Sequence, residues 1–225
     1  MLILGIDTST HVCSVALSEN GKTLDFIENA EGMLHASIIT VQIQELLERN
    51  QYGLNQLGAV AISKGPGSYT GLRIGTSVAK GLCYALEIPL VSVSTLEALA
   101  WQVTNNNINE FALYIPMIDA MRMEVYTAVY TSTLDCIKEP YALEVTPTAF
   151  ENYTGVRTCY FFGNGAMKCL ETLTHINAVF LPNQNCSAVN LSALAYHKLI
   201  KNETESVAYF YPEYIKQYHF VKHKN

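Results

Sequence analysis

The sequence lacks the features that mark membrane-spanning and exported proteins. No apolar run approaches the ~20 residues that cross a bilayer, and the N-terminus shows no basic region followed by a cleavage-site pattern. The six cysteines are scattered without a Cys-x-x-Cys pair, which favours reduced, buried thiols over a zinc site or a disulfide framework. We therefore expect a cytoplasmic protein without membrane contact.

Positive charge is also scarce. The 225 residues include 14 lysines and arginines against 20 aspartates and glutamates, which gives a formal net charge of −6 at pH 7. Affinity for nucleic acid is built largely on neutralised phosphates, so this balance argues against RNA binding by the chain alone. If RNA is involved, we expect a partner to hold it.

Residue clusters for metal or nucleophilic chemistry are missing as well. The single His-x-x-x-His spacing, His219 and His223, stands near the C-terminus without a third ligand, whereas a zinc or iron site normally needs at least three protein ligands. No Ser/His/Asp or Cys/His arrangement can be assigned from spacing, because such sites are defined by geometry. We expect no metal site and no catalytic residue.

What is present alternates between strand and helix patterns in two similar halves. Asn20-Gly21 predicts a type I′ hairpin turn between the second and third strands. We predict strands at 2–6, 12–18, 23–27, 57–62, 90–93, 111–118, 125–131 and 159–162, and helices at 35–50, 71–86, 94–103, 167–173 and from 187 toward 200. The polar run 104–110 separates the halves. This order predicts an α/β protein of two related subdomains, 1–103 and 104–225, with the final helix and tail packing back on the first.

The most distinctive segment is Gly65-Pro-Gly-Ser-Tyr-Thr-Gly-Leu-Arg-Ile-Gly75. Its glycines and proline suit a sharp turn from a strand into a helix. It lacks the Gly-Lys-Ser/Thr ending of a P-loop, although free amides at a helix start can meet an anion. Two interpretations remain open, an anion site and a tight turn without a ligand.

Small residues recur at every fourth position of the helix that follows, at Gly71, Gly75, Ala79 and Cys83. Each helical glycine costs about 1 kcal/mol relative to alanine, so two of them need a compensating reason. We interpret this small-residue stripe as the surface that a partner's helix approaches; packing within the chain is the alternative. On the preceding helix a second apolar face, separate from the predicted core face, points to the same role: Leu34, Ile38 and Val41.

Two aspartates end the opening strands of the two halves, Asp7 and Asp119. In a two-subdomain fold they would face a cleft from opposite sides. The hydroxyls of Thr8, Ser9 and Thr10 could then receive phosphate oxygens, and Asp7 could hold hydrated Mg²⁺. The same residue types also favour plain turns, because they hydrogen-bond to nearby backbone.

Several segments together resemble the TsaB (YeaZ) family: Ile6-Asp-Thr-Ser-Thr10, Cys13-Ser-Val-Ala-Leu17, the segment Gly65 to Gly75, Glu124-Val-Tyr126 and Tyr211-Pro-x-Tyr214. The resemblance implies two actin-like, ribonuclease-H-like subdomains of the ASKHA class. It also implies a non-catalytic scaffold for making threonylcarbamoyladenosine on tRNA. The implied partners are a TsaD-type catalytic subunit, a TsaE-type ATPase, tRNA only through the complex, and a second copy when the chain is alone. No cofactor is expected to bind tightly, with ATP and Mg²⁺ only in the complex.

Two departures from the family pattern stand out. Tyr69 replaces the usual phenylalanine, and Met121 replaces the usual arginine, with Arg122 one place later. The catalytic paralogue carries a His-x-x-x-His pair on its first helix, where this chain has only His35 and then Ile39. The alternative function is an ATP-dependent small-molecule kinase of the same fold, using Asp7 and Asp119.

Overall fold

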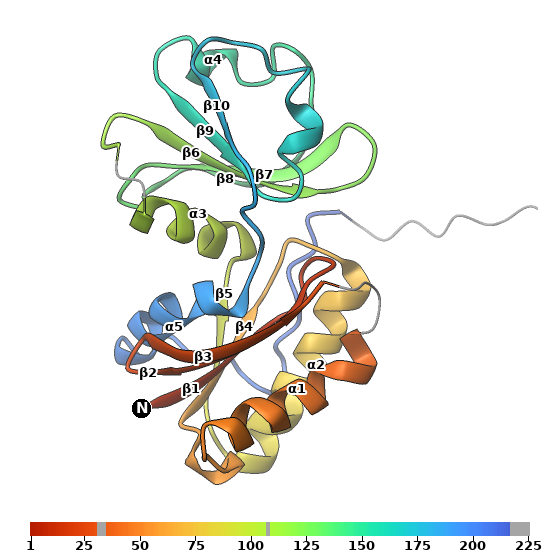
Figure 1. Ribbon diagram of the computed structural model, residues 1–225, viewed down its shortest axis with the longest axis vertical. Helices are drawn as coiled ribbons and strands as arrows, with labels where there is room; N and C mark the ends of the chain where they lie inside the picture. Colours follow the sequence, from red (N-terminus) through yellow and green to blue (C-terminus); the bar gives the residue numbers. More distant parts are fainter. Residues whose placement is uncertain (31–34, 107–108, 217–225) are drawn as a thin grey trace, which may run out of the picture.

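The computed structural model describes residues 1–30, 35–106 and 109–216, which form two five-stranded sheets (Figure 1). The first sheet has the order β3-β2-β1-β4-β5 and the second β10-β9-β6-β7-β8, so the two orders correspond strand for strand. In each sheet the opening strand pairs antiparallel with the next strand and parallel with a later one. The prediction of two related α/β subdomains is confirmed.

The strands of the first sheet are β1 (Leu2–Asp7), β2 (Cys13–Glu19), β3 (Lys22–Asn29), β4 (Ala59–Ser63) and β5 (Leu90–Val93). Those of the second are β6 (Leu113–Asp119), β7 (Glu124–Tyr130), β8 (Cys136–Glu144), β9 (Cys159–Phe162) and β10 (Ala178–Leu181). The α-helices are α1 (His35–Arg49), α2 (Tyr69–Leu86), α3 (Thr95–Asn106), α4 (Glu151–Thr154) and α5 (Leu191–Ile200). Short 3₁₀ helices are η1 (Leu54–Gln56), η2 (Met167–Cys169) and η3 (Ala188–Asn190). No described helix has the length and apolarity that would let it span a bilayer.

The hairpin between β2 and β3 follows the sequence signal at Asn20-Gly21. Both residues have left-handed backbone angles, with φ of 51° and 81°, as a type I′ turn requires. Glu19 and Lys22 pair directly across the turn. The hairpin prediction is therefore confirmed in turn type and register.

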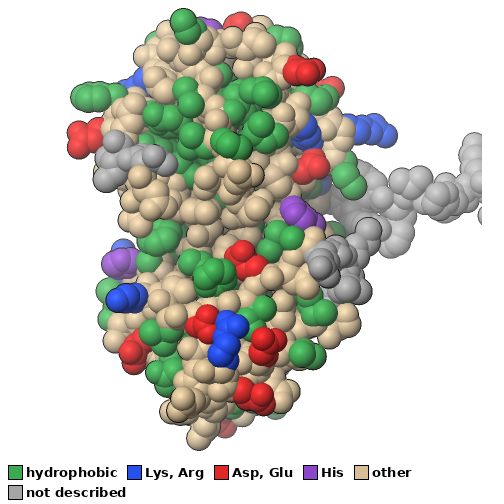
Figure 2. Space-filling model, in the orientation of Figure 1, with side chains coloured by type: hydrophobic (Ala, Val, Ile, Leu, Met, Phe, Trp, Pro, Cys, Tyr) green, Lys and Arg blue, Asp and Glu red, His purple; other side chains and the backbone are tan. Residues whose placement is uncertain are grey.

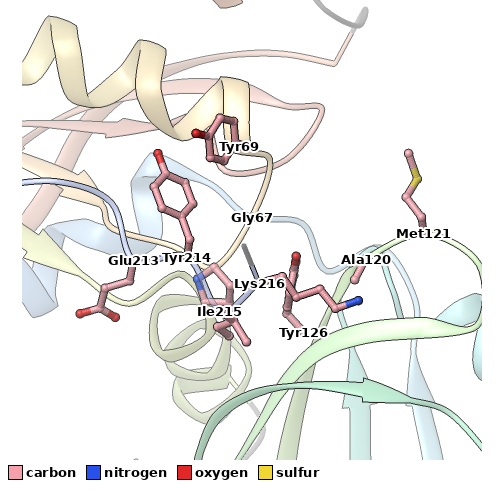
Figure 3. A pocket seen from close by; sticks show the side chains of 10 residues that line it. Gly67, Tyr69, Ala120, Met121, Tyr126, Glu213, Tyr214, Ile215 and Lys216 are labelled. Carbon is pink, nitrogen blue, oxygen red and sulfur yellow. The ribbon is translucent and has the colours of Figure 1, made fainter. Parts of the chain in front are cut away.

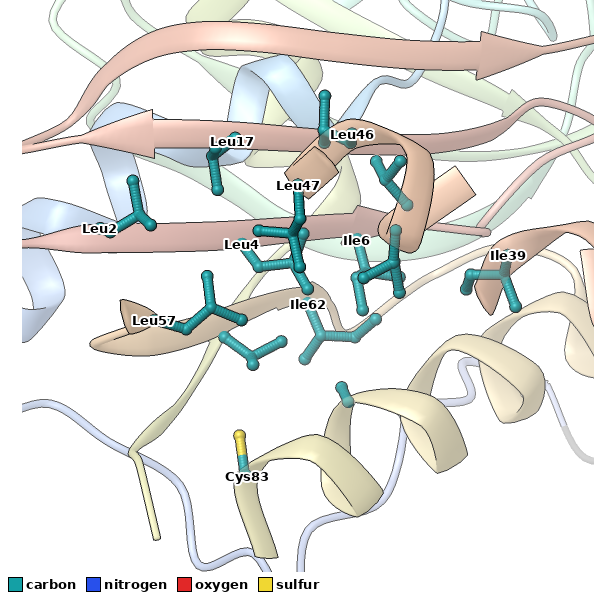
Figure 4. Packing of buried hydrophobic residues seen from close by; sticks show 14 of the residues in the cluster. Leu2, Leu4, Ile6, Leu17, Ile39, Leu46, Leu47, Leu57, Ile62 and Cys83 are labelled. Carbon is teal, nitrogen blue, oxygen red and sulfur yellow. The ribbon is translucent and has the colours of Figure 1, made fainter. Parts of the chain in front are cut away.

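Helices cover both faces of the first sheet. On one face α1 and α2 pack against β1, β2 and β4 around a core that includes Leu4, Ile6, Ile39, Leu46 and Ile62 (Figure 4). On the other face α5, from late in the chain, packs through Leu191 and Ala195. Helix α3 packs on the second sheet through residues such as Leu99, so α3 and α5 lie between the sheets. The predicted boundary at 103–104 falls inside α3.

The residues after α5, up to Lys216, run back over the first subdomain as an extended strap. The Glu205 amide donates to the Leu90 carbonyl at 2.8 Å, and the Glu213 amide donates to the Lys64 carbonyl at 2.7 Å. Lys216 then forms an ion pair with Glu124 of β7, which belongs to the second sheet. The strap therefore links the edge of the first sheet to the second subdomain.

The largest differences from the predicted elements are in the second half. Strands β8 and β10 were not expected, and the helix predicted at 167–173 is the single 3₁₀ turn η2. Both missed strands are sheet edges. β8 carries Lys138, Glu139 and Pro140, residue types that protect edges but weaken the sequence signal for a strand.

Candidate functional site

The segment Gly65–Gly71 packs directly on the turn that follows β1. The Ser68 amide donates to the Ser9 carbonyl at 2.6 Å, and Thr8 Oγ1 donates to the Gly71 carbonyl at 2.8 Å. Ser68 also caps α2, because its Oγ accepts from the Gly71 amide. A Cβ at Gly67 would lie 2.3 Å from the Ser9 carbonyl oxygen. Of the two interpretations of this segment, the geometry favours the tight turn without a ligand.

The small-residue stripe of α2 faces the chain's own first sheet. Gly71, Gly75, Ala79 and Cys83 are all buried, and Cys83 points into the core in Figure 4. A Cβ at Gly71 would lie 2.1 Å from the Thr8 carbonyl oxygen, and one at Gly75 would lie 2.3 Å from Thr8 Oγ1. The interpretation of this stripe as a partner surface is therefore wrong. The glycines allow β1 and its turn, and not another molecule, to approach the helix.

Some apolar residues of α1 and α2 face away from the first sheet and remain accessible. Val41 is 60% exposed and Ile38 is half-buried against the core, while Leu34 lies outside the described residues. A groove of about 420 Å³ runs between the helices. Its apolar lining comes from Ile43, Leu47, Tyr52, Leu54, Val78 and Leu82. We call this feature the α1–α2 groove.

Asp7 lies in the interior beneath the Gly65–Gly71 turn. Its side chain belongs to a residue only 1% exposed, and Thr8, Ser9 and Thr10 are buried with it. Asp7 Oδ1 accepts from the Ser9 amide at 2.9 Å and from Ser9 Oγ at 2.6 Å, while Oδ2 has no hydrogen-bond partner within the described ranges. Burial raises the pKa of Asp7, and the hydrogen bonds from Ser9 oppose that rise. The expected phosphate turn is thus filled by the chain itself.

Asp119 has a different environment, at the protein surface. Its carboxylate forms an ion pair with Lys168, and its Oδ1 also accepts from the Met121 amide at 3.0 Å. The expectation that Asp7 and Asp119 face an open cleft from its two sides is therefore wrong, because one is sealed inside and the other is already ion-paired.

An aromatic recess between the subdomains was not found from the sequence (Figure 3). It measures about 360 Å³, and Tyr69, Tyr126 and Tyr214 contribute to its walls. The rings of Tyr69 and Tyr214 lie 4.7 Å apart, and the Arg73 guanidinium lies 4.0 Å from the centre of the Tyr69 ring. Met121, at the position where the family usually has arginine, also lines the recess. The Tyr211-Pro-x-Tyr214 segment was visible in the sequence. Its contact with α2 joins residues far apart in the chain, so the sequence did not predict the recess.

No group of three His, Cys, Asp or Glu side chains in residues 1–30, 35–106 and 109–216 could hold a metal ion. His35 is buried at the start of α1, and its Nε2 has no hydrogen-bond partner there. His219 and His223 lie outside the described residues.

The Asp7→Asn variant should become more stable than the natural chain as the pH rises, because the natural chain loses stability that asparagine keeps. A carboxyl group whose pKa is raised by folding contributes stability that is present below its unfolded pKa, about 3.9, and that is lost as pH rises through its folded pKa. Asparagine has no charge to lose, and its side-chain oxygen can keep the Ser9 hydrogen bonds. Melting temperatures between pH 4 and 8 provide the measurement.

Asp25→Asn is the control of opposite sign, because Arg49 holds the pKa of Asp25 below its usual range. At neutral pH Asp25→Asn should melt slightly below the natural chain, and this difference in melting temperature should disappear as the pH falls. A melting temperature of Asp7→Asn that drops below the natural chain's with rising pH would show that Asp7 is stabilised as an anion.

Comparison with known proteins agrees with this geometry. A family model described as TsaD, tRNA N6-adenosine threonylcarbamoyltransferase, matches residues 30–222. A TsaB protein of Haemophilus influenzae, described as a tRNA threonylcarbamoyladenosine biosynthesis protein, is 36% identical over 126 residues, 56% of this chain and 52% of the relative. The TsaB protein of Escherichia coli is 38% identical over 130 residues, 58% of this chain and 55% of the relative. These matches span about half the length of the curated relatives.

Solved structures match almost the whole chain. YeaZ from Pseudomonas aeruginosa superposes with a TM-score of 0.82 at 27% identity, covering 95% of this chain and 99% of that one. A nucleotide-bound activator of 2-hydroxyisocaproyl-CoA dehydratase from Clostridium difficile shares the fold alone, with a TM-score of 0.54 at 9% identity, 90% coverage of this chain and 97% of the other. Since the family model covers most of the sequence and the YeaZ structure nearly all of it, the chain belongs to the TsaB (YeaZ) family, within the wider group that the TsaD model describes.

Proposed function

We propose that this chain is a non-catalytic subunit that supports the formation of threonylcarbamoyladenosine on tRNA. It does so by binding a TsaD-type catalytic subunit, together with a TsaE-type ATPase. Membership of the TsaB family supports the pathway. The observation that carries the scaffold role is the α1–α2 groove, an accessible apolar surface.

The α1–α2 groove has the form of a helix-binding surface. Two packed helices leave a furrow between them, and the apolar ridge of a third helix fills such a furrow well. Leu54 in its lining is 44% exposed, and a partner helix would remove it from water. We assign the partner surface to this groove and its rim, in place of the small-residue stripe. The same surface would join two copies of the chain when no TsaD-type subunit is present.

The kinase alternative receives no support from the Asp7 turn. Asp7, Thr8 and Ser9 are buried and already hydrogen-bonded, so a phosphate would have to displace the Gly65–Gly71 turn. We therefore propose that nucleotide and Mg²⁺ enter only with the assembled complex. Figure 2 shows acidic and basic side chains interspersed on the face in view, without a positive stretch among the described residues drawn there. The net charge of −6 supports tRNA contact through the partner.

Reconstitution with partners from the same organism tests the proposal. The chain alone, given Mg-ATP, should make no threonylcarbamoyladenosine and transfer no phosphate to small acceptors. With an activated threonylcarbamoyl donor present in every reaction, adding the chain to the TsaD-type and TsaE-type subunits should raise product on a tRNA transcript strongly, as measured by nucleoside chromatography. Full activity without the chain would contradict the scaffold role. Micromolar Mg-ATP binding by the isolated chain, measured by calorimetry, would restore the kinase reading.

A further inference from the structure

The strap that follows α5 divides at Pro212 into two parts that are held by different forces. In the first part Val207 and Phe210 pack against the core of the first subdomain, and Pro212 is buried. Lys80 Nζ of α2 donates to two carbonyls of this part, at 3.1 and 3.0 Å. We call residues 205–212 the inner strap. Salt does not weaken the burial of apolar side chains that holds it.

Charged groups at the surface hold the second part, Glu213–Lys216, which we call the clasp. The side chain of Glu213 is 57% exposed and forms an ion pair with Lys64 at 2.6 Å. The side chain of Lys216 is 45% exposed and forms an ion pair with Glu124 of β7. Ion pairs with this exposure contribute little each, and salt screens them. The clasp is therefore more weakly held than the inner strap.

An aromatic contact joins the clasp to α2. The ring of Tyr214 lies 4.7 Å from the ring of Tyr69, and Arg73 Nε donates to Tyr214 Oη at 3.2 Å. Tyr69 and Arg73 both belong to α2 in the first subdomain, whereas the partner of Lys216 belongs to the second. The clasp therefore connects the two subdomains over a length of four residues.

The clasp also forms one wall of the aromatic recess (Figure 3). All four of its residues line this recess, together with Gly67 of the first subdomain and with Met121 and Tyr126 of the second. If the clasp moved away, the recess would lose that wall while the inner strap stayed docked.

We propose that residues 213–216 are a salt-sensitive clasp, which closes the aromatic recess and opens it without undocking the inner strap. Segments with few buried apolar contacts open locally at a lower free energy than the core does. The change from apolar to ionic contacts at Pro212 sets the point where such an opening stops. The inference concerns the isolated chain and does not depend on the scaffold role.

Amide hydrogen exchange of the full chain, followed residue by residue by NMR, tests the inference. The Glu213 amide, which donates to the Lys64 carbonyl at 2.7 Å, reports on the clasp. The amides of Glu205 and Phe210, each hydrogen-bonded at 2.8 Å, report on the inner strap. Between about 0.01 M and 1 M NaCl the Debye length falls from about 30 to about 3 Å. Over that range we expect the protection of the Glu213 amide to fall several-fold relative to the other two.

Lys216→Met removes the ion pair with Glu124 and keeps a long side chain. At low salt it should speed exchange of the Glu213 amide by up to about 5-fold, the factor that an exposed ion pair supplies, and at high salt the effect should shrink. Adding Glu124→Gln to this variant should cause no further acceleration, because both changes remove the same pair. Lys201→Met is the matched control, since it removes the same charge from the exposed end of α5 and should change nothing.

A soluble, neutral gadolinium chelate shows whether the recess opens with the clasp. Its paramagnetic relaxation of the Tyr126 ring should increase in Lys216→Met and at high salt, because Tyr126 lines the recess from the second subdomain. Equal loss of protection at Glu213, Glu205 and Phe210 would overturn the inference, since the strap would then open as one piece. Protection of Glu213 that is independent of salt, the same acceleration in Lys201→Met, or unchanged relaxation of Tyr126 would also overturn it.

Discussion

Gly71→Ala is expected to destabilise the isolated protein by about 1–3 kcal/mol, the usual cost of forcing extra atoms into a packed site. The new methyl group would lie 2.1 Å from the Thr8 carbonyl oxygen, a backbone atom that cannot rotate away. In a chain of 225 residues each kcal/mol corresponds to about 2–4 °C in melting temperature. Gly75→Leu should cost more, because its larger side chain would meet Thr8 Oγ1 and Ile62. Thermal unfolding of the isolated chain is the measurement.

Gly81→Ala is the matched control on the same helix. A Cβ at Gly81 would meet nothing within 4 Å, so alanine should stabilise the protein by up to about 1 kcal/mol through helix propensity alone. The same glycine-to-alanine change is therefore expected to lower stability in Gly71→Ala and to raise it in Gly81→Ala. If Gly71→Ala melted as high as Gly81→Ala while failing to form a complex, the stripe would face outward after all.

Leu54→Glu is expected to abolish assembly with the TsaD-type subunit and with it the formation of threonylcarbamoyladenosine. Leu54 lines the α1–α2 groove yet is 44% exposed, so a polar side chain there is tolerated in the free chain. In a complex the glutamate would be desolvated beside Glu48 without a cation, which costs several kcal/mol. Size-exclusion chromatography of the mixed subunits, followed by the tRNA assay, gives the two readouts.

Ile176→Glu is the control for a surface apolar-to-acid change. Ile176 is 91% exposed and precedes β10 in the second subdomain, so its variant should assemble and function normally. An active Leu54→Glu complex of normal size would move the partner surface away from the groove. A loss shared by both variants would indicate a general effect of added negative charge.

Short sequence motifs predicted the elements whose geometry depends on residues adjacent in the sequence. Asn20-Gly21 has left-handed angles that few other residue pairs adopt, so the first hairpin followed from two residues. The helix predicted from 187 begins as the 3₁₀ turn η3, which Ser187 caps by accepting from the Val189 amide at 3.1 Å, and the α-helix α5 starts only at Leu191. Edge strands such as β8 gave little signal, because the charges and proline that protect an edge resemble those of a loop.

The candidate site depended on contacts between distant segments, and there the sequence was insufficient. The position of Asp7 at a strand end was predicted correctly. Its burial was not, because it depends on the hydrogen bond between Ser68 and Ser9, residues far apart in sequence. The stripe on α2 was recognised as a close-approach surface, but spacing alone does not say whether the approaching atoms belong to a partner or to Thr8.

The position of α5 affects the order in which the chain can fold during synthesis. Residues 2–93 supply every strand of the first sheet, but one face of that sheet is covered by a helix at Leu191–Ile200. A nascent chain that has completed the first five strands still exposes Ile3, Ala61 and Val91 until about a hundred further residues have been added at about 5–20 residues per second. The strap that pairs with β5 comes later still. The first sheet to leave the ribosome is therefore the last to have both faces covered. A protein truncated before α5 should aggregate through the uncovered face.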